Sequence, residues 1–419
     1  MFNRVLILSA TSGAGHVRAA QAIEQAFKES GAAKEVRHVD ALEYTSPMLR
    51  QLYSKTYIDM VNKAPTLLGW LYDVTDKPWK AERRRLAFDR LNARPLMGLL
   101  KKYQPELVVC THFMPAEIIS WLLCTERIDT RHCIVVTDFD VHAMWLCRHY
   151  DHYFAALQES KEHLHKMGVP LDRISVTGIP IDPIFAIDKE PLEMRKKHGL
   201  DPTKPIILMS SGGFGVGKTT EILDSLGELK HPVQVLAMCG RNEQLKNELN
   251  EMSKSLKQQG RLLDIKPIGF TKEMDEYMSA ADILLGKPGG LTTSEALAKG
   301  LAFVIVNPIP GQEERNSDHL LEEGAGIRCN NLPALAYKLD KLLDEPEKLY
   351  AMRANARRLG KPKAAAEIVA DLLAMQESGF TTAAKHKSAG HSCLSPQAKL
   401  WANATTFMKK QNLNATRVL

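Results

Sequence analysis

The residues best suited to carry out chemistry lie between positions 282 and 316, where an apolar strand pattern runs into a glycine loop. Lys287, Gly289 and Gly290 form this loop, and a short helix is expected over 294–299. The free N–H groups and the dipole of a helix N-terminus attract anions, and glycine lets the backbone approach them closely. This stretch therefore predicts a phosphate-binding loop.

The polar residues of this helix and of the following loop suit sugars. Thr292 or Thr293 can cap the helix, which places Glu295 in its first turn. A carboxylate at this position would repel a phosphate oxygen, but it suits the paired hydroxyls of a ribose. One strand further along the chain, Gln312 and Glu313 could hold the hydroxyls of another sugar. The alternative is an ordinary strand–helix–strand unit with a tight turn.

These motifs also resemble a known family. The run Lys287-Pro-Gly-Gly-Leu-Thr-Thr-Ser-Glu295-Ala, followed by Pro310-Gly-Gln-Glu313 and Asn316, is similar to the donor site of UDP-sugar glycosyltransferases of the glycosyltransferase-B fold. The subgroup it resembles contains the plant-type monogalactosyldiacylglycerol synthases and the bacterial processive diacylglycerol glucosyltransferases, which usually have Ala-Gly-Pro-Gly after the lysine. The resemblance covers about residues 4–375. It implies an α/β protein with two doubly wound Rossmann-like domains facing a cleft.

A second glycine turn precedes the first expected helix. Gly13 and Gly15 follow a strand pattern and imitate a dinucleotide-binding start, but Arg18 stands where the third glycine or alanine belongs. The resemblance implies that both glycines lie at the donor site and that His16 is the catalytic base. Taken alone, a loop histidine can equally cap a helix or be solvated.

The segment 137–145 resembles a signature of the bacterial glucosyltransferase branch. Asp138 and His142 lie at the carboxyl end of a predicted strand, where open α/β sheets bind ligands, and we treat both as candidate catalytic residues. His112 and Asp140 would have to join them in a metal site, but this spacing fits no closed ligand set. We therefore expect no metal.

The run 212–219 has the full spacing of a P-loop and follows a strand pattern, so it also predicts a nucleoside triphosphatase. No apolar strand ending in Asp follows it at a useful distance to hold Mg²⁺. In the resembled family a Gly-Gly-x-Gly turn at this place contacts the donor, which implies this role for Gly213 and Gly215. A later turn receives the uracil base there, and Phe270 is the candidate here.

Basic residues are concentrated in one segment. Positions 45–102 contain twelve Lys or Arg against five Asp or Glu, in a region without strand signals that we interpret as helical over 45–104. Aromatic residues beside cations suit an interfacial helix on anionic lipid. The membrane-facing candidates are Trp70, Trp79, Arg83, Arg84 and Arg85. A solvated helical insertion with its own small core is the alternative.

Alternating strand and helix patterns predict two domains. We expect an acceptor-side domain, a linker, a donor-binding domain, a helix returning to the first domain and a loose tail, at 1–177, 178–203, 204–360, 361–376 and 377–419. The resemblance implies inverting transfer of glucose or galactose from a UDP-hexose, without a cofactor, to diacylglycerol. We expect a cytoplasmic enzyme, peripheral on the inner face of the cell membrane, that binds no nucleic acid. A polyprenyl-linked or sterol acceptor, a P-loop ATPase and a non-catalytic binding protein remain alternatives.

Overall fold

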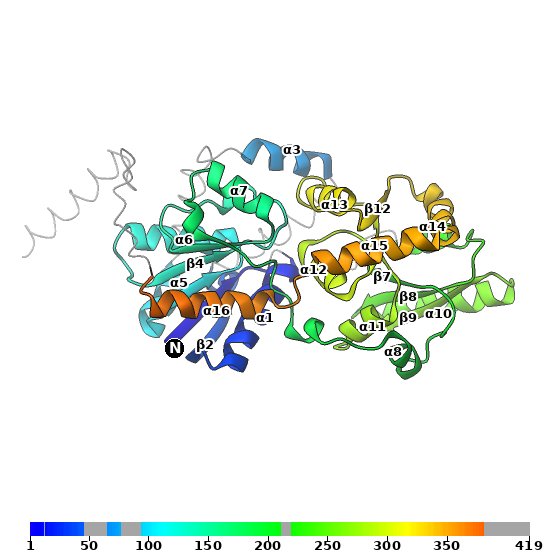
Figure 1. Ribbon diagram of the computed structural model, residues 1–419, viewed down its shortest axis with the longest axis horizontal. Coiled ribbons are helices and arrows are strands. Elements are labelled where there is room, and N and C mark those ends of the chain that lie inside the picture. The colour runs from blue at the N-terminus through cyan, green and yellow to red at the C-terminus, as the bar shows by residue number, and fades with distance from the viewer. Residues whose placement is uncertain (12, 46–64, 77–93, 211–218, 381–419) are drawn as a thin grey trace, which may run out of the picture.

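The computed structural model describes residues 1–11, 13–45, 65–76, 94–210 and 219–380, and it divides into two α/β halves (Figure 1). Each half has a six-stranded sheet, with strand orders β2-β1-β3-β4-β5-β6 and β12-β11-β10-β7-β8-β9. Every strand pairing is parallel among the described residues. The predicted α/β class with two doubly wound domains is confirmed.

The first half contains the N-terminus and is completed by the last described helix. Its strands are β1 (Phe2–Ser9), β2 (Ala33–Asp40), β3 (Leu107–Cys110), β4 (Arg131–Val135), β5 (His152–Ala155) and β6 (Ile174–Val176). Its helices are α1 (Ala14–Ser30), η1 (Ala41–Tyr44), α3 (Pro65–Thr75), α5 (Arg94–Tyr103), α6 (Phe113–Cys124), η2 (Ala143–Trp145), α7 (Gln158–Lys166), η3 (Leu171–Arg173) and α16 (Ala364–Glu377).

The second half contains the sequence motifs of the predicted phosphate loop. Its strands are β7 (Ile206–Ser210), β8 (Val233–Gly240), β9 (Leu263–Gly269), β10 (Ile283–Gly286), β11 (Ala302–Val306) and β12 (Gly326–Cys329). Its helices are α8 (Pro191–Lys197), α9 (Thr219–Leu226), α10 (Glu243–Gln258), α11 (Met274–Ala280), α12 (Gly290–Lys299), α13 (Gln312–Glu322), η5 (Leu332–Ala334), α14 (Leu335–Asp344) and α15 (Pro346–Leu359), and η4 (Pro183–Ala186) precedes them.

Each sheet is buried on both faces, which explains the continuous apolar runs that mark its strands in the sequence. In β1, Leu6 and Leu8 pack into one apolar cluster, and Val5 and Ile7 pack into the cluster on the opposite face. The edge strand β12 was not predicted from the sequence. This strand has only four residues, which include Gly326 and alternate little between apolar and polar types, so it gives no clear strand pattern.

The chain crosses between the halves twice, and the two crossings touch. Gly178 follows β6 with φ of +93°, and a Cβ there would lie 2.6 Å from the Cβ of Lys361. Past the second crossing, α16 packs against α1 (Figure 1). Its Ile368, Val369 and Leu372 belong to the apolar cluster that contains Val5 and Ile7 of β1. We therefore propose the boundaries given above, with linker 178–203 and returning helix 361–376.

Helix α3 belongs to the basic segment and lies across the upper side of the molecule, beside α13 of the second half (Figure 1). A Cβ at Gly69 would lie 2.9 Å from the Cβ of Pro310, so the glycine allows this close approach. Leu67, Trp70 and Val74 point outward from α3 and are 50%, 59% and 41% exposed. In the described parts of the chain, we find no helix with the length and apolar character needed to span a bilayer.

Replacing Gly178 tests the crossing. The Gly178→Ala variant should be destabilised by about 1–3 kcal/mol, because it combines a left-handed backbone with a clash against Lys361. Gly98→Ala is the matched control, since Gly98 is an exposed residue of α5 with open space around it, and alanine there should be neutral or stabilising by up to about 1 kcal/mol. Urea unfolding followed by circular dichroism measures both. Equal stability of the two variants would contradict this account of the crossing.

Candidate active site

The candidate site lies where the carboxyl ends of the two sheets approach each other, and Thr137 is its meeting point. From the first half, Nδ1 of His16 on α1 lies 2.7 Å from Oγ1 of Thr137. From the second half, α12 begins at Gly290, where a Cβ would lie 2.5 Å from the carbonyl oxygen of Thr137. The predicted base and the predicted phosphate-binding helix are therefore brought together.

The hydrogen bonds of His16 fix which ring nitrogen carries its proton. Nδ1 lies 3.0 Å from the carbonyl oxygen of Thr111, which can only accept, so Nδ1 is the protonated nitrogen. The hydroxyl of Thr137 donates to the same carbonyl at 3.4 Å and accepts from Nδ1. Nε2 consequently holds the lone pair. Burial of the ring lowers the His16 pKa to about 4, against a smaller opposing effect of the Thr111 bond, so the imidazole is neutral at pH 7.

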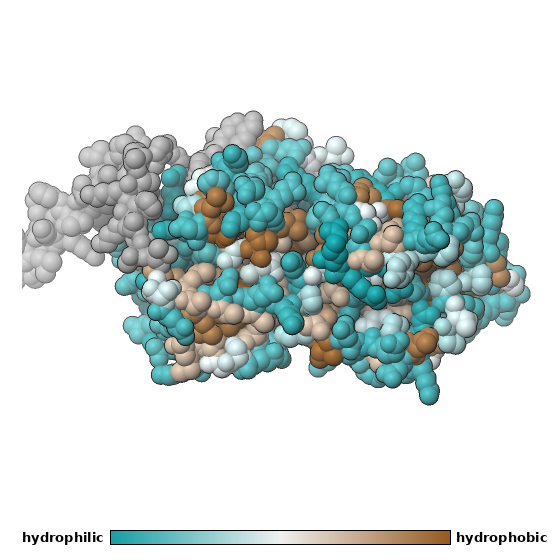
Figure 2. Space-filling model, in the orientation of Figure 1, coloured by the Kyte–Doolittle hydropathy of each residue, from teal (hydrophilic) through white to brown (hydrophobic). Residues whose placement is uncertain are grey.

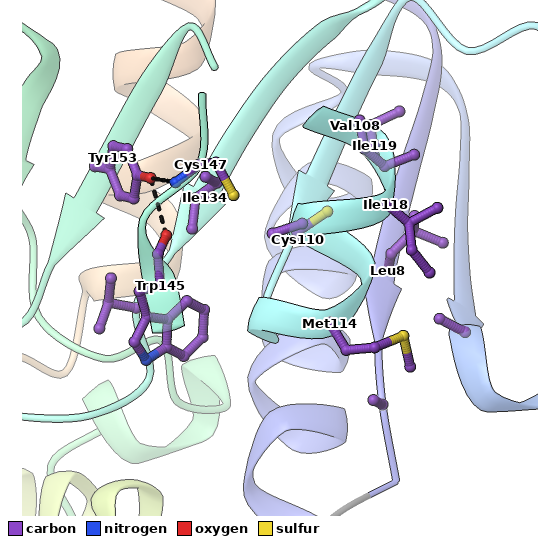
Figure 3. Packing of buried hydrophobic residues seen from close by; sticks show 14 of the residues in the cluster. Leu8, Val108, Cys110, Met114, Ile118, Ile119, Ile134, Trp145, Cys147 and Tyr153 are labelled. Carbon is purple, nitrogen blue, oxygen red and sulfur yellow. Dashed lines mark hydrogen bonds between the residues drawn. The ribbon is translucent and has the colours of Figure 1, made fainter. Parts of the chain in front are cut away.

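Asp138 is connected to both halves of the molecule. Its carboxylate accepts a bond of 3.2 Å from Nε1 of Trp145 and another from Gln312 on α13. The Trp145 segment is held by Tyr153, whose hydroxyl accepts from the Cys147 amide and donates to the Trp145 carbonyl, both at 2.9 Å (Figure 3). Burial raises the Asp138 pKa to about 6, although these hydrogen bonds lower it.

The start of α12 differs from the predicted one. The helix begins at Gly290 with Gly289 as its N-cap, so neither Thr292 nor Thr293 caps it, and within the described residues no side chain caps its first N–H groups. Gly290 can begin the helix here because a larger residue would collide with Thr137. Lys287, partly exposed, precedes this turn. Uncapped N–H groups, glycines and a lysine are a suitable arrangement for an anion.

Glu295 lies in the second turn of α12 rather than in the first, because the helix begins earlier than predicted. Its side chain is 2% exposed and forms an ion pair with Arg18 of α1, across the boundary between the halves. Burial raises its pKa to about 7, Arg18 lowers it, and Asp182 raises it. From the sequence we assigned Arg18 no role. The one indication that this residue is unusual was that it interrupts the dinucleotide-binding pattern.

Two other predicted donor-site residues hold loops in place. Nδ2 of Asn316 donates to the Pro288 carbonyl at 2.9 Å, and its Oδ1 accepts from the Phe139 amide of the first half at 3.4 Å. Asn316 is fully buried, so it fixes the glycine loop against the other half. Glu313 accepts from the Ile309 amide at 2.7 Å, and burial raises its pKa.

His142 is engaged at both nitrogens. Nδ1 accepts from the Met144 amide at 3.0 Å, so Nε2 carries the proton that it donates to the Tyr72 carbonyl at 2.9 Å. This arrangement favours a role in holding α3, and a catalytic role of His142 stays a prediction. Arg315 of α13 adds to the same contact: it lies over the Tyr72 ring and forms ion pairs with Asp76 and Asp140.

Some of the remaining candidates lie within the described residues and the others lie outside them. Phe270 follows β9, and its 61% exposure leaves aromatic surface available to a base. The guanidinium of Arg241 lies 5.0 Å from the centre of its ring. Gly13 and Gly15 are at the start of α1, where a Cβ at Gly15 would lie 3.8 Å from that of Leu291. The other predicted residues lie outside the described ones: Gly213, Gly215, Trp79, Arg83, Arg84 and Arg85.

A metal has one geometrically possible position among the described residues, at His198, Glu273 and Glu276. Lys197 already pairs with both glutamates, at 3.0 and 2.6 Å, and His198 pairs with Glu276 at 2.7 Å. The cluster is therefore an ion-pair network on α8 and α11 and lies apart from the candidate site.

Comparison with known proteins finds a family match for each half. Residues 16–181 match the monogalactosyldiacylglycerol synthase family, and residues 192–359 match glycosyl transferases group 1. A processive diacylglycerol beta-glucosyltransferase of Staphylococcus saprophyticus is 31% identical over 375 residues, which are 88% of this chain and 92% of that protein. The enzyme of the same name from Bacillus mycoides is 30% identical, over 88% of this chain and 93% of its own.

The chain belongs to the diacylglycerol glycosyltransferase family. This confirms the resemblance found in the sequence, and the protein is a glycosyltransferase. The family match to the first half ends at residue 181, just past Gly178, and the match to the second half begins at residue 192.

Solved structures confirm the glycosyltransferase-B fold. MurG of Acinetobacter baumannii is similar with a TM-score of 0.59 at 19% identity, over 89% of this chain and 99% of that one. Anabaena HepE in complex with UDP and glucose has a TM-score of 0.53 at 14% identity, over 89% of this chain and 99% of that one. A UDP-N-acetylglucosamine 2-epimerase has a TM-score of 0.52 at 14% identity, over 90% of this chain and 98% of that one. Because an epimerase shares this architecture, the structural likeness establishes the fold alone.

The tautomer of His16 can be measured directly. We expect the ¹⁵N spectrum of histidine-labelled protein to show His16 as the Nδ1–H form at pH 7, with the midpoint of its protonation at a pH of about 4. The His16→Gln variant identifies the signal. An Nε2–H tautomer would show that the bond to Thr111 does not orient the ring. Titration near the ordinary histidine value of about 6.5 would show that burial does not lower the pKa of His16.

Proposed function

We propose that this enzyme transfers a hexose from a UDP-sugar to diacylglycerol, with inversion at the anomeric carbon. The observation that supports this most strongly is the convergence of His16 and the N-terminus of α12 on Thr137. One group can take a proton and the other can bind a diphosphate. The names of the relatives, which are diacylglycerol glucosyltransferases, support the lipid acceptor, and the UDP in the HepE complex supports the donor.

His16 acts as the general base in this proposal. The acceptor hydroxyl attacks the anomeric carbon, the bond from that carbon to the UDP oxygen breaks, and the hydroxyl proton passes to Nε2 of His16. A neutral imidazole with its lone pair on Nε2 is the form required. A pKa of about 4 by itself makes His16 a weak base. The negative diphosphate of a bound donor would favour the protonated ring and raise this pKa.

The departing UDP needs positive potential, since it gains negative charge as the sugar leaves. The first N–H groups of α12 and the ammonium of Lys287 would supply it, and the start of α12 at Gly290 without a side-chain cap supports this role for the N–H groups. Glu295 would accept from the ribose hydroxyls, and Phe270 would stack on or lie beside the uracil. Gln312 and Glu313, at the start of α13, are our candidates for the hexose hydroxyls.

The acceptor is a lipid, so the enzyme must reach a membrane surface, and we propose that the segment containing α3 does this. Leu67, Trp70 and Val74 are spaced three and four residues apart and therefore share one face of the helix. Hydrophobic atoms are visible at the upper edge of the molecule, where α3 lies (Figure 2). The basic residues that follow in the sequence, including Arg83 to Arg85, would meet anionic headgroups.

One assay tests the proposed reaction. Purified protein is mixed with dispersed diacylglycerol and either UDP-glucose or UDP-galactose, and glycolipid products and released UDP are measured by mass spectrometry. We expect glycosyl-diacylglycerol from at least one donor, and the linkage at the new bond should be beta. UDP release without glycolipid, or ATP hydrolysis that Lys218→Ala abolishes, would contradict the proposal.

Replacing the base should separate catalysis from binding. His16→Ala should lower turnover by about 10²–10⁴-fold, the usual contribution of a general base, while the affinity for UDP stays near that of the wild type. Titration calorimetry with UDP and initial rates with diacylglycerol provide the two measurements. A variant with normal turnover would move the role of base to another residue, and Asp138 would be the next candidate because its raised pKa of about 6 suits proton transfer.

The membrane segment is tested by two sets of substitutions. The first variant changes Leu67, Trp70 and Val74 together to Ser, and the second replaces Arg83 to Arg85 with Glu. Each variant should lower vesicle binding and lipid-acceptor activity together. The first loses its apolar face, and the second loses basic residues that each contribute about 1 kcal/mol near an anionic surface. Tyr350→Ser removes an exposed aromatic residue from α15 and serves as the control. Binding is measured by co-sedimentation with phosphatidylglycerol vesicles at low salt. If both variants pellet like the wild type, the segment is a solvated insertion.

A further inference from the structure

The ion pair between Arg18 and Glu295 joins the two halves at the proposed donor site. Arg18 extends from α1, and Glu295 is nearly inaccessible on α12, so the pair spans the domain boundary. The arginine side chain remains 42% exposed, whereas only 2% of the glutamate side chain is. The cation therefore keeps much of its contact with water, while the carboxylate depends on the protein for its stabilisation.

The surroundings of Glu295 make this dependence strong. Ala19 of α1 and Leu291 and Ala296 of α12 belong to one apolar cluster that extends across both halves. Among the described residues, Arg18 and Asp182 are the charged groups that act on Glu295, and they have opposite effects, because Asp182 is an anion. Without Arg18 the carboxylate would face apolar groups and another negative charge, and it would take up a proton.

The position of Arg18 on α1 also fits a role at the site. Residues two apart on a helix point about 200° away from each other. His16 points toward Thr111 and Thr137 of its own half, and Arg18 points toward α12 of the other half. The same turn of helix therefore positions the proposed base and the partner of the proposed ribose acceptor.

We propose that Arg18 is a positioning residue of the donor site, which holds the buried Glu295 carboxylate ionised and in place so that it can accept hydrogen bonds from the ribose hydroxyls. The inference rests on the proposed function, since it requires a nucleotide sugar at α12. A carboxylate accepts stronger hydrogen bonds than a carboxylic acid does. Donor affinity then depends on the protonation of Glu295, and Arg18 sets the pH at which this occurs.

The test is the affinity for UDP-glucose, measured by titration calorimetry between pH 6 and 8.5 without acceptor. UDP-glucose is the suitable probe because both of its phosphates are esterified and neither loses a further proton in this range, unlike the terminal phosphate of UDP. Wild-type affinity should fall as the pH is lowered through about 7, where Glu295 takes up its proton. The acid-mimicking variant Glu295→Gln should bind weakly and without this pH dependence.

Arg18→Gln should bind about three- to tenfold more weakly than the wild type at pH 7.5, with a loss that shrinks as the pH is raised, since a higher Glu295 pKa leaves less carboxylate near neutrality. Arg18→Lys keeps the charge and should stay within about twofold of the wild type. Lys28→Gln removes an exposed cation from the other end of α1 and is the matched control. Circular dichroism confirms that each variant is folded.

Three results would overturn the inference or its basis. An Arg18→Gln loss of the same size at every pH would mean that the pair only supports the structure. Tighter binding by Arg18→Gln would mean that Arg18 competes with the ribose. If Glu295→Gln itself binds UDP-glucose as tightly as the wild type, the ribose assignment of the proposed function fails, which is distinct from the failure of the role of Arg18 alone.

Discussion

The arrangement of the site depends on one close contact, that of Gly290 with the carbonyl oxygen of Thr137. A side chain at the first residue of α12 would hold this helix away from the first half. Without the contact, His16 and the helix N-terminus would no longer share a neighbour, and the ion pair between Arg18 and Glu295 would have to span a longer gap. Asn316 stabilises the same contact because it bonds to loops on both sides of it.

The elements of the fold were largely predictable, because strands buried on both faces leave continuous apolar runs in the sequence. The apolar strand pattern before the glycine loop corresponds to β10, and the strand pattern before Gly13 corresponds to β1. The start of α12 was misjudged for a physical reason: we gave the capping role to threonine, whose side-chain hydroxyl can accept a hydrogen bond from the first turn. The structure instead uses glycine, and the space it leaves is needed for the approach to Thr137.

The candidate site could be predicted in its residue types but not in its pairings. Sequence patterns identify which side chains suit phosphate or sugar, and they contain little information on contacts between residues far apart in the chain. Gln312 reaches Asp138 across 174 positions, and Arg18 reaches Glu295 across 277. Polar groups that suit a substrate satisfy one another in these pairs, which stabilises the contact between the two halves.

The order in which the elements occur in the chain has a consequence for biosynthesis. Helix α16 is the last helix of the described residues, yet its Ile368, Val369 and Leu372 cover the apolar surface of Phe2 and Phe27 in the half that is made first. An emerging N-terminal half therefore exposes that surface while the whole second half is translated. The second half can complete its own sheet in the meantime, since its six strands lie within 206–329. Folding on the ribosome would thus finish in the later half first, and the earlier half would need protection from aggregation until its last helix is released.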